Sequence, residues 1–383
     1  MNPYLVFPYI SLFILGLCDN VRGPVFPEIL NYFKLNDFNG SLFFAISSGM
    51  GILGSISVKK MLHRYHDYIC LAVSSVFLFL GMFIISVSNS YLVLMFGSMF
   101  VGTSVGMLGV VQNLMVMTST SPARISKAQS GLHSMYGLAS LFSPLLVNVC
   151  LGFFQNWRSV FLLTSITCLL FSFCIIWKRK KFTRSVHKKS DEEKIQVPSV
   201  ETKKSIIFGF LIATYVLAEI LVSTRMTLYL TRVYEFGIEH ANYYTSAFFV
   251  LLLSGRVLFT FWHPSWSKKK VLTVSLISSL FCLSLGLLVH PLFLVLTGLT
   301  MSVFYPISMA SLSTIFKRYV HTAASWAIAL SSVCVITMHA SVGYMTQKFG
   351  IANAFWLGPV VLVICLILLL SFSKNYKEHQ LDW

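Results

Sequence analysis

Residues 8–33, PYISLFILGLCDNVRGPVFPEILNYF, form an apolar run with charged residues near its middle, and they indicate the fold first. A helix needs about 20 mostly apolar residues to cross a bilayer, so this run is long enough. A charge at mid-depth costs roughly 2.5–3.5 kcal/mol, and such residues persist where they face a protein interior or a water-filled cavity. The run therefore predicts a membrane helix with a polar function.

Two further features of this run concern its charges and its prolines. Asp19 and Arg22 are three positions apart, so they share one helix face and can neutralise each other. Gly23-Pro24 and Pro27 follow, and they interrupt the helix because proline has no backbone donor. A broken, charged first helix is typical of a transport pathway.

The composition predicts an all-α membrane protein. The chain has 383 residues, of which 56% are hydrophobic and 11% are charged, and its mean hydropathy is +0.76. The first run is too long for a signal peptide and lacks a basic segment before it. Apolar runs of spanning length number twelve: 6–30, 40–61, 68–88, 92–117, 127–151, 158–177, 206–230, 243–264, 271–289, 292–315, 322–346 and 353–372.

The net charge of +16 is explained by the loops rather than by a nucleic-acid partner. Of the 29 Lys and Arg residues, 22 fall in alternate loops and the C-terminal tail on one side of the predicted helices, and 4 fall on the other side. Cytoplasmic loops carry this excess in membrane proteins. We therefore expect a multi-pass protein of the cell (inner) membrane, with both termini and the loop at 178–204 in the cytoplasm.

The spans divide into two sets of six. We predict an N-terminal bundle at 1–177, a polar cytoplasmic linker at 178–204, and a C-terminal bundle with a short tail at 205–383. The halves resemble weak repeats, since GSLFFAISSGMGILGS (40–55) is similar to TSAFFVLLLSGRVLFT (245–260). Two parallel repeats of six helices place a substrate site between them near the midplane of the membrane.

Few charges lie deep in the predicted membrane, and both halves contribute to them. The deep acids are Asp19 and Glu219, and the deep basic residues are Arg22, Arg225 and Arg256. Such residues face a bundle interior or a cavity. We expect them to line one central cavity, although an ion network that only locks the helices together is the alternative. Glu219 and Arg225 are six apart, so Glu219 is expected to reach Arg256 or the substrate instead.

Polar residues without charge complete the predicted site. Gln129, His133, Tyr136 and Ser140 follow a helical spacing that keeps them on one face of the fifth span. They are expected to face the cavity or the fourth span, which carries Gln112 and Asn113. An aromatic wall in the second half is expected from Tyr305 and Trp326, and Asn20 is a further candidate ligand.

Signatures of enzymes and cofactors do not occur in the sequence. It has no GxxxxGK[ST] motif for a nucleotide phosphate, no HExxH motif and no paired-cysteine metal site. The eight cysteines lie in or beside apolar runs, where we expect them to serve as small packing residues. We therefore expect no catalysis, no metal, no cofactor and no nucleic-acid partner, and we expect a monomer embedded in lipid.

Two stretches resemble a known family. The six-plus-six arrangement with a basic central loop is similar to the major facilitator superfamily. Within it, residues 16–42 resemble the first helix and following loop of the fucose–proton symporter group, and KAQSGLHSMYGLASLFSP (127–144) resembles the fifth helix of that group and of its glucose-transporting relatives. The resemblance implies the fold of two pseudo-symmetric six-helix bundles and transport by alternating access.

This chain departs from that group at the residues that carry protons there. The group's aspartate in the first helix would fall at Gly23, and its glutamate in the fourth helix would fall near Gly109. The fucose mechanism therefore does not transfer. In its place, the deep arginines favour a small polar solute with a carboxylate or phosphate.

Several alternatives remain open at this stage. A neutral sugar, held by Asn20, Gln112, Asn113 and Gln129, is what the resemblance implies, and drug or metabolite efflux and a non-transporting receptor are further possibilities. If transport is driven by protons, the carrier must be a group that can change charge, which excludes arginine. Asp19 has Arg22 one turn away, whereas Glu219 has no basic neighbour at that spacing on its own helix. Glu219 is therefore ranked first, His133 second and Asp19 third.

Overall fold

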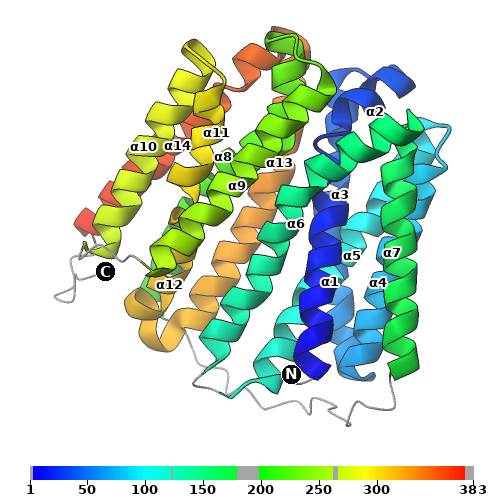
Figure 1. Ribbon diagram of the computed structural model, residues 1–383. Helices are drawn as coiled ribbons and strands as arrows, with labels where there is room; N and C mark the ends of the chain where they lie inside the picture. Colours follow the sequence, from blue (N-terminus) through cyan, green and yellow to red (C-terminus); the bar gives the residue numbers. More distant parts are fainter. Residues whose placement is uncertain (1–2, 122–123, 179–197, 262–265, 376–383) are drawn as a thin grey trace. The chain divides into compact units, whose positions relative to one another are not determined.

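The computed structural model describes residues 3–121, 124–178, 198–261 and 266–375 (Figure 1). Over these ranges the chain forms helices joined by short connections, and no strand occurs in them. The chain divides into two compact units, Met1–Glu193 and Lys194–Trp383. Of the predicted linker, residues 179–197 lie outside the described residues. The next helix begins at Ser199 rather than after residue 204, with Pro198 before its first turn and Glu201 within it.

The first unit contains seven helices in its described residues. They are α1 (Pro3–Asn20), α2 (Phe26–Phe33), α3 (Asp37–Leu62), α4 (Asp67–Ser86), α5 (Tyr91–Ser119), α6 (Ile125–Phe154) and α7 (Arg158–Trp177). Within the unit, α1 packs against α5 and α6, α3 packs against α5, and α4 packs against α5 and α7 (Figure 1).

The second unit repeats this arrangement in its described residues. Its helices are α8 (Ser199–Val233), α9 (Ile238–Phe261), α10 (Lys268–Leu288), α11 (Leu292–Met301), α12 (Phe304–Phe316), the 3-10 turn Lys317–Tyr319, α13 (Val320–Ala354) and α14 (Leu357–Asn375). The principal pairs are α8 with α13 and α14, α9 with α11, and α10 with α11 and α14. The pair of α8 with α14 has only a weak counterpart, α1 with α7, whereas the other pairs correspond in order to α1 with α6, α3 with α5, and α4 with α5 and α7.

Within the described residues, each of the twelve predicted spans coincides with a helix or with a pair of helices. Ten helical segments in the described part of the chain are long and apolar enough to cross a membrane, and Leu292–Tyr319 counts among them as one segment. The other two predicted spans are the broken first one and α9. The 24 residues of α9 extend about 36 Å, which is long enough to cross a membrane.

Two of the spans are broken by proline. The first is interrupted by a turn at 21–25 between α1 and α2, which confirms the break predicted from Pro24 and Pro27. The run 292–315 is also divided, at residues 302–303, and this break was not predicted. In a continuous helix the N–H of residue 306 would donate to the carbonyl of Ser302, but residue 306 is proline.

Glycine lets the paired helices approach closely in both units. A Cβ atom at Gly106 of α5 would lie 1.8 Å from the carbonyl oxygen of Gly51 in α3. At Gly298 of α11 it would lie 2.3 Å from the carbonyl oxygen of Phe248 in α9. Small residues at such contacts are typical of helices that associate within membranes. They hold α3 and α9, which carry Ser47 and Arg256, close to their neighbours.

Candidate functional site

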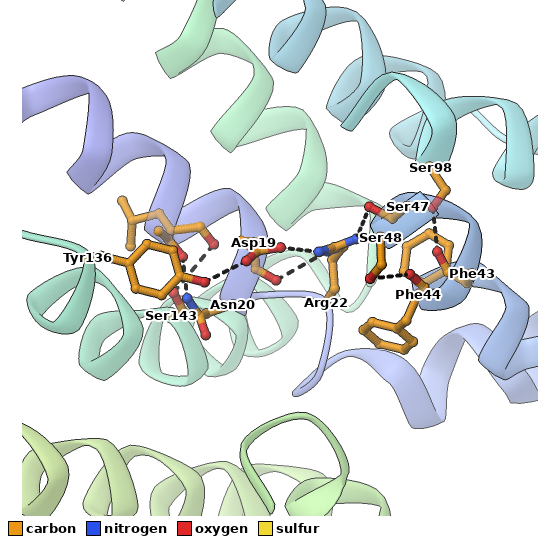
Figure 2. Close-up of polar contacts among 12 residues, drawn as sticks. Asp19, Asn20, Arg22, Phe43, Phe44, Ser47, Ser48, Ser98, Tyr136 and Ser143 are labelled. Atoms are coloured by element: carbon orange, nitrogen blue, oxygen red, sulfur yellow. Dashed lines mark hydrogen bonds and ion pairs between the residues drawn. The ribbon is translucent and has the colours of Figure 1, made fainter. Parts of the chain in front are cut away.

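The polar centre of the first unit surrounds the break between α1 and α2. Arg22 lies in the turn and forms an ion pair with the carboxylate of Asp19, the penultimate residue of α1 (Figure 2). Its Nε donates to the backbone carbonyl of Asp19 at 3.2 Å, and its Nη1 donates to Ser47 Oγ of α3 at 2.8 Å. The arginine therefore joins a carboxylate, a carbonyl at the end of a helix and a second helix.

Aromatic side chains complete this centre. The Tyr136 hydroxyl of α6 donates to Asp19 Oδ2 at 2.5 Å, so both carboxylate oxygens have partners (Figure 2). The guanidinium carbon of Arg22 lies 5.8 Å from the ring centre of Phe43 and 5.6 Å from that of Phe44. Arg22 is 7% exposed. An arginine buried this deeply is suited to holding structure, because a ligand has little access to its donors.

The amides predicted to bind substrate are engaged in contacts of the first unit. Gln112 is fully buried, and its amide lies 2.8 Å from Ser11 Oγ, which ties α5 to α1 in either orientation of the amide. The side-chain nitrogens of Asn20 and Asn113 each donate to the backbone carbonyl four residues earlier, at 2.8 and 2.6 Å. Gln129 donates to the carbonyl of Asn113 at 3.1 Å. Their role as ligands stays a prediction.

The polar centre of the second unit surrounds the break between α11 and α12. Arg256 Nη2 of α9 lies 3.3 Å from Glu219 Oε1 of α8, which confirms the expectation that Glu219 reaches Arg256. Arg256 Nε donates to the carbonyl of Ser302 at 3.2 Å. That carbonyl is the one that Pro306 cannot bond.

A second carbonyl of this break is also held by a side chain. The Tyr215 hydroxyl donates to the carbonyl of Met301 at 2.5 Å, and its ring stacks on Phe304 at 4.2 Å between ring centres. Tyr215 lies one turn before Glu219, and Tyr305 lies within electrostatic reach of Glu219 and Arg256. Two carbonyls at the break, the ion pair and two tyrosines thus form one cluster.

The remaining predicted residues differ in their exposure. Arg225 is 1% exposed in α8, His133 is exposed on α6, and Trp326 is half-buried on α13. That the two sets line one shared cavity stays a prediction. The sequence analysis missed Ser47, Tyr215 and the Ser302 carbonyl. The spacing of four between Tyr215 and Glu219 could have indicated Tyr215, and Pro306 could have indicated the carbonyl.

Comparison with known proteins identifies the family and the fold. A sequence model of the Major Facilitator Superfamily matches residues 9–293. No curated protein matches the chain. Among solved structures, a bacterial homologue of the human lysosomal transporter Spinster, inward-facing and occupied, is similar with a TM-score of 0.74 at 15% identity, covering 98% of each chain.

A second similar structure comes from a peptide transporter. The peptide transporter POT in complex with sulfate has a TM-score of 0.77 at 14% identity, over 97% of this chain and 94% of that one. At these identities the likeness concerns the fold, which is the all-helical major facilitator fold.

Proposed function

The chain belongs to the major facilitator superfamily, whose members are secondary transporters that work by alternating access, and on this premise we propose that it carries a small anionic solute together with protons. The observation that carries the proposal is the partly exposed ion pair of Glu219 and Arg256. Its side chains are 21% and 30% exposed, whereas the side chain of Arg22 is 8% exposed. Arg256 is therefore the more accessible of the two paired arginines.

Arginine suits a carboxylate or phosphate because its planar guanidinium offers several donors in a fixed fork. Arg256 already holds one carboxylate, that of Glu219. A substrate with the same chemistry can take its place. The preferred ligand is therefore a small molecule with a carboxylate or phosphate group.

Proton coupling follows from the charge balance of this pair. Glu219 and Arg256 are neutral together, so an anion that binds Arg256 leaves the carboxylate of Glu219 without its compensating charge. An uncompensated charge in a membrane protein is costly, and a proton removes it. Anion and proton then favour each other's binding, as linkage requires. Glu219 remains the first candidate for the proton carrier, but the anion is what releases it from Arg256.

A neutral sugar is the alternative substrate. The amides that would hold its hydroxyls, those of Asn20, Asn113 and Gln129, donate to backbone carbonyls within the first unit. Donors engaged in this way are less available to a sugar, which supports the anionic solute over the neutral one.

A thermal-shift screen of the purified protein tests the substrate class. Each anion is paired with a neutral analogue, such as glucose 6-phosphate with glucose and succinate with succinamide. A ligand at 100 times its Kd stabilises the folded state by about 2.7 kcal/mol, so a binder raises the Tm by several degrees. We expect an anionic member to do so, and to do so more strongly at pH 6 than at pH 8.

Two variants connect the effect to the proposed site. Arg256→Gln should lose the stabilisation, and Arg318→Gln, at an exposed arginine beyond α12, should keep it. Stabilisation by neutral sugars alone, or an anion effect that survives Arg256→Gln, would contradict the proposal.

A further inference from the structure

The broken helix of the second unit depends on a side chain from another helix. Pro306 leaves the Ser302 carbonyl without its usual backbone donor, and Arg256 Nε donates to it at 3.2 Å. The adjacent carbonyl of Met301 accepts from Tyr215 at 2.5 Å. Both Ser302 and Met301 are buried, at 1% and 0% exposure, so losing either donor would be costly.

The same guanidinium also holds the carboxylate of Glu219. Its Nη2 lies 3.3 Å from Glu219 Oε1 while its Nε serves Ser302, so one rigid group joins the charge and the break. A guanidinium is planar, and its donors cannot move independently. A change in the partner of Nη2 therefore alters the position of Nε.

The backbone next to Arg256 is closely packed. The neighbouring Gly255 faces Ser302, and a Cβ atom there would lie 2.2 Å from Ser302 Oγ. The α9 backbone thus lies directly against the break. When the arginine moves, the Ser302 carbonyl must follow or lose its donor.

The first unit contains an equivalent arrangement. Arg22 Nε donates to the backbone carbonyl of Asp19 at 3.2 Å, its Nη2 pairs with the Asp19 carboxylate, and the helix breaks directly afterwards. Two independent sites thus share one design, in which an arginine joins a deep carboxylate to a carbonyl at a helix break. In the first unit the carboxylate and the carbonyl belong to one residue, whereas in the second they lie on different helices.

We propose that Arg256 is a positioning residue that sets the bend between α11 and α12 according to the charge and partner of Glu219. The effect of an anion on the bend rests on the proposed function. The effect of protonating Glu219 does not, because loss of its charge weakens the pair with Arg256 whether or not a substrate binds. A change at the site thus becomes a change in the shape of the tenth span.

A double-mutant cycle tests whether Arg256 holds the break. Arg256→Met removes every donor at similar length, and Pro306→Ala supplies the missing N–H to Ser302. Both are made in the Glu219→Gln background, where loss of the arginine leaves no carboxylate unpaired. We expect Arg256→Met to lower the Tm with proline at 306, and to lower it by less than half as much with alanine there. Pro291→Ala, at the start of α11, should give no such rescue.

An equal loss of Tm with proline and with alanine at position 306 would overturn the proposal. So would an equal rescue by Pro291→Ala, because the effect would then not depend on the Ser302 carbonyl. These Tm comparisons need no substrate, so they can be interpreted even if the anion screen finds no ligand.

Hydrogen exchange then separates positioning from mere structural support. In the otherwise unmodified protein, peptides covering 301–310 should exchange faster at low pH, after correction for intrinsic rates, because protonation of Glu219 loosens Arg256. Glu219→Gln and Arg256→Met should each abolish this pH dependence. A flat profile in the unmodified protein, or a pH dependence that persists in Arg256→Met, would overturn the proposal.

Discussion

The carboxylate of Asp19 shows how single residues make charge tolerable at membrane depth. Its two oxygens are held by Arg22 and Tyr136, and the pair is neutral. Glu219 is similarly paired with Arg256, and Tyr215 lies one turn away on the same helix. A deep charge that lacks such a partner is costly. The two carboxylates are equally exposed, but Arg256 is more exposed than Arg22, and our proposal of a transport role for the second pair rests on this difference.

The first prediction concerns coupling at Glu219. In vesicles, Glu219→Gln should abolish accumulation driven by a pH gradient, because glutamine cannot take up a proton. It should still exchange labelled for unlabelled substrate, since exchange needs no net proton movement. Both rates are measured with the substrate that the thermal-shift screen identifies.

A matched variant controls for the change from carboxylate to amide. Glu235→Gln, at an exposed turn after α8, should accumulate substrate normally. Normal accumulation by Glu219→Gln would remove Glu219 from the mechanism.

The second prediction concerns the hydrogen bond from Tyr136 to Asp19. Tyr136→Phe should lower the free energy of unfolding by roughly 0.6–2 kcal/mol, the range for hydrogen bonds between membrane helices. Thermal unfolding of the purified variant measures this as a fall in Tm of a few degrees. Tyr344→Phe, at a half-exposed position on α13, should leave the Tm unchanged. Equal Tm values for both variants would show that the 2.5 Å contact contributes no stability.

At the residue scale, the sequence predicts contacts within a helix better than contacts between helices. The pairing of Asp19 with Arg22 follows from their spacing, and Arg256 was one of two partners expected for Glu219. The contacts of Ser47 with Arg22 and of Tyr215 with Met301 could not be predicted. They depend on how each helix is rotated about its axis, and spans that are apolar on all sides do not show which face is inward.

At the scale of elements, the two breaks differ in how plainly the sequence marks them. The first has Gly23, Pro24 and Pro27 beside a charged residue, and it was predicted. The second has only Pro306 inside an apolar run. A single proline in a membrane helix can be accommodated by neighbouring groups, as the side chains of Arg256 and Tyr215 show here. The sequence therefore indicates that the helix is disturbed near Pro306, but it does not show that the helix breaks there.

The third prediction concerns the contact between α3 and α5. Gly106→Ala places a Cβ atom 1.8 Å from the Gly51 carbonyl oxygen, so the helices must separate. Overpacking of this kind costs about 1–3 kcal/mol, and thermal unfolding should show a clearly lower Tm. The matched variant is Gly109→Ala, one turn further along α5, where a Cβ atom would meet nothing within 4 Å. A Tm for Gly106→Ala as high as that for Gly109→Ala would contradict the close approach of these helices.

At the scale of the whole molecule, the internal repeat was the most predictable feature. Two sets of six apolar runs and the similarity of 40–55 to 245–260 indicated it, and the helix pairs of each unit agree. In both copies the paired phenylalanines of this stretch meet edge to face, at 5.2 Å for Phe43 with Phe44 and 5.3 Å for Phe248 with Phe249. The substrate was not predictable, because it depends on a few side chains rather than on the pattern of spans.

The last prediction concerns the orientation of the chain in the membrane. Of the Lys and Arg residues, 22 lie in the loops and tail assigned to the cytoplasm and 4 in those assigned to the outside. Translocating the more basic loops is unfavourable, so this asymmetry sets the topology. Reporter fusions after residue 190 and after residue 383 should both read cytoplasmic. A fusion after Gln155, between α6 and α7, should read external and shows that the assay detects both sides. An external signal at 190 would contradict this topology. It would invert both halves together, because six spans return each half to the side of the membrane on which it begins.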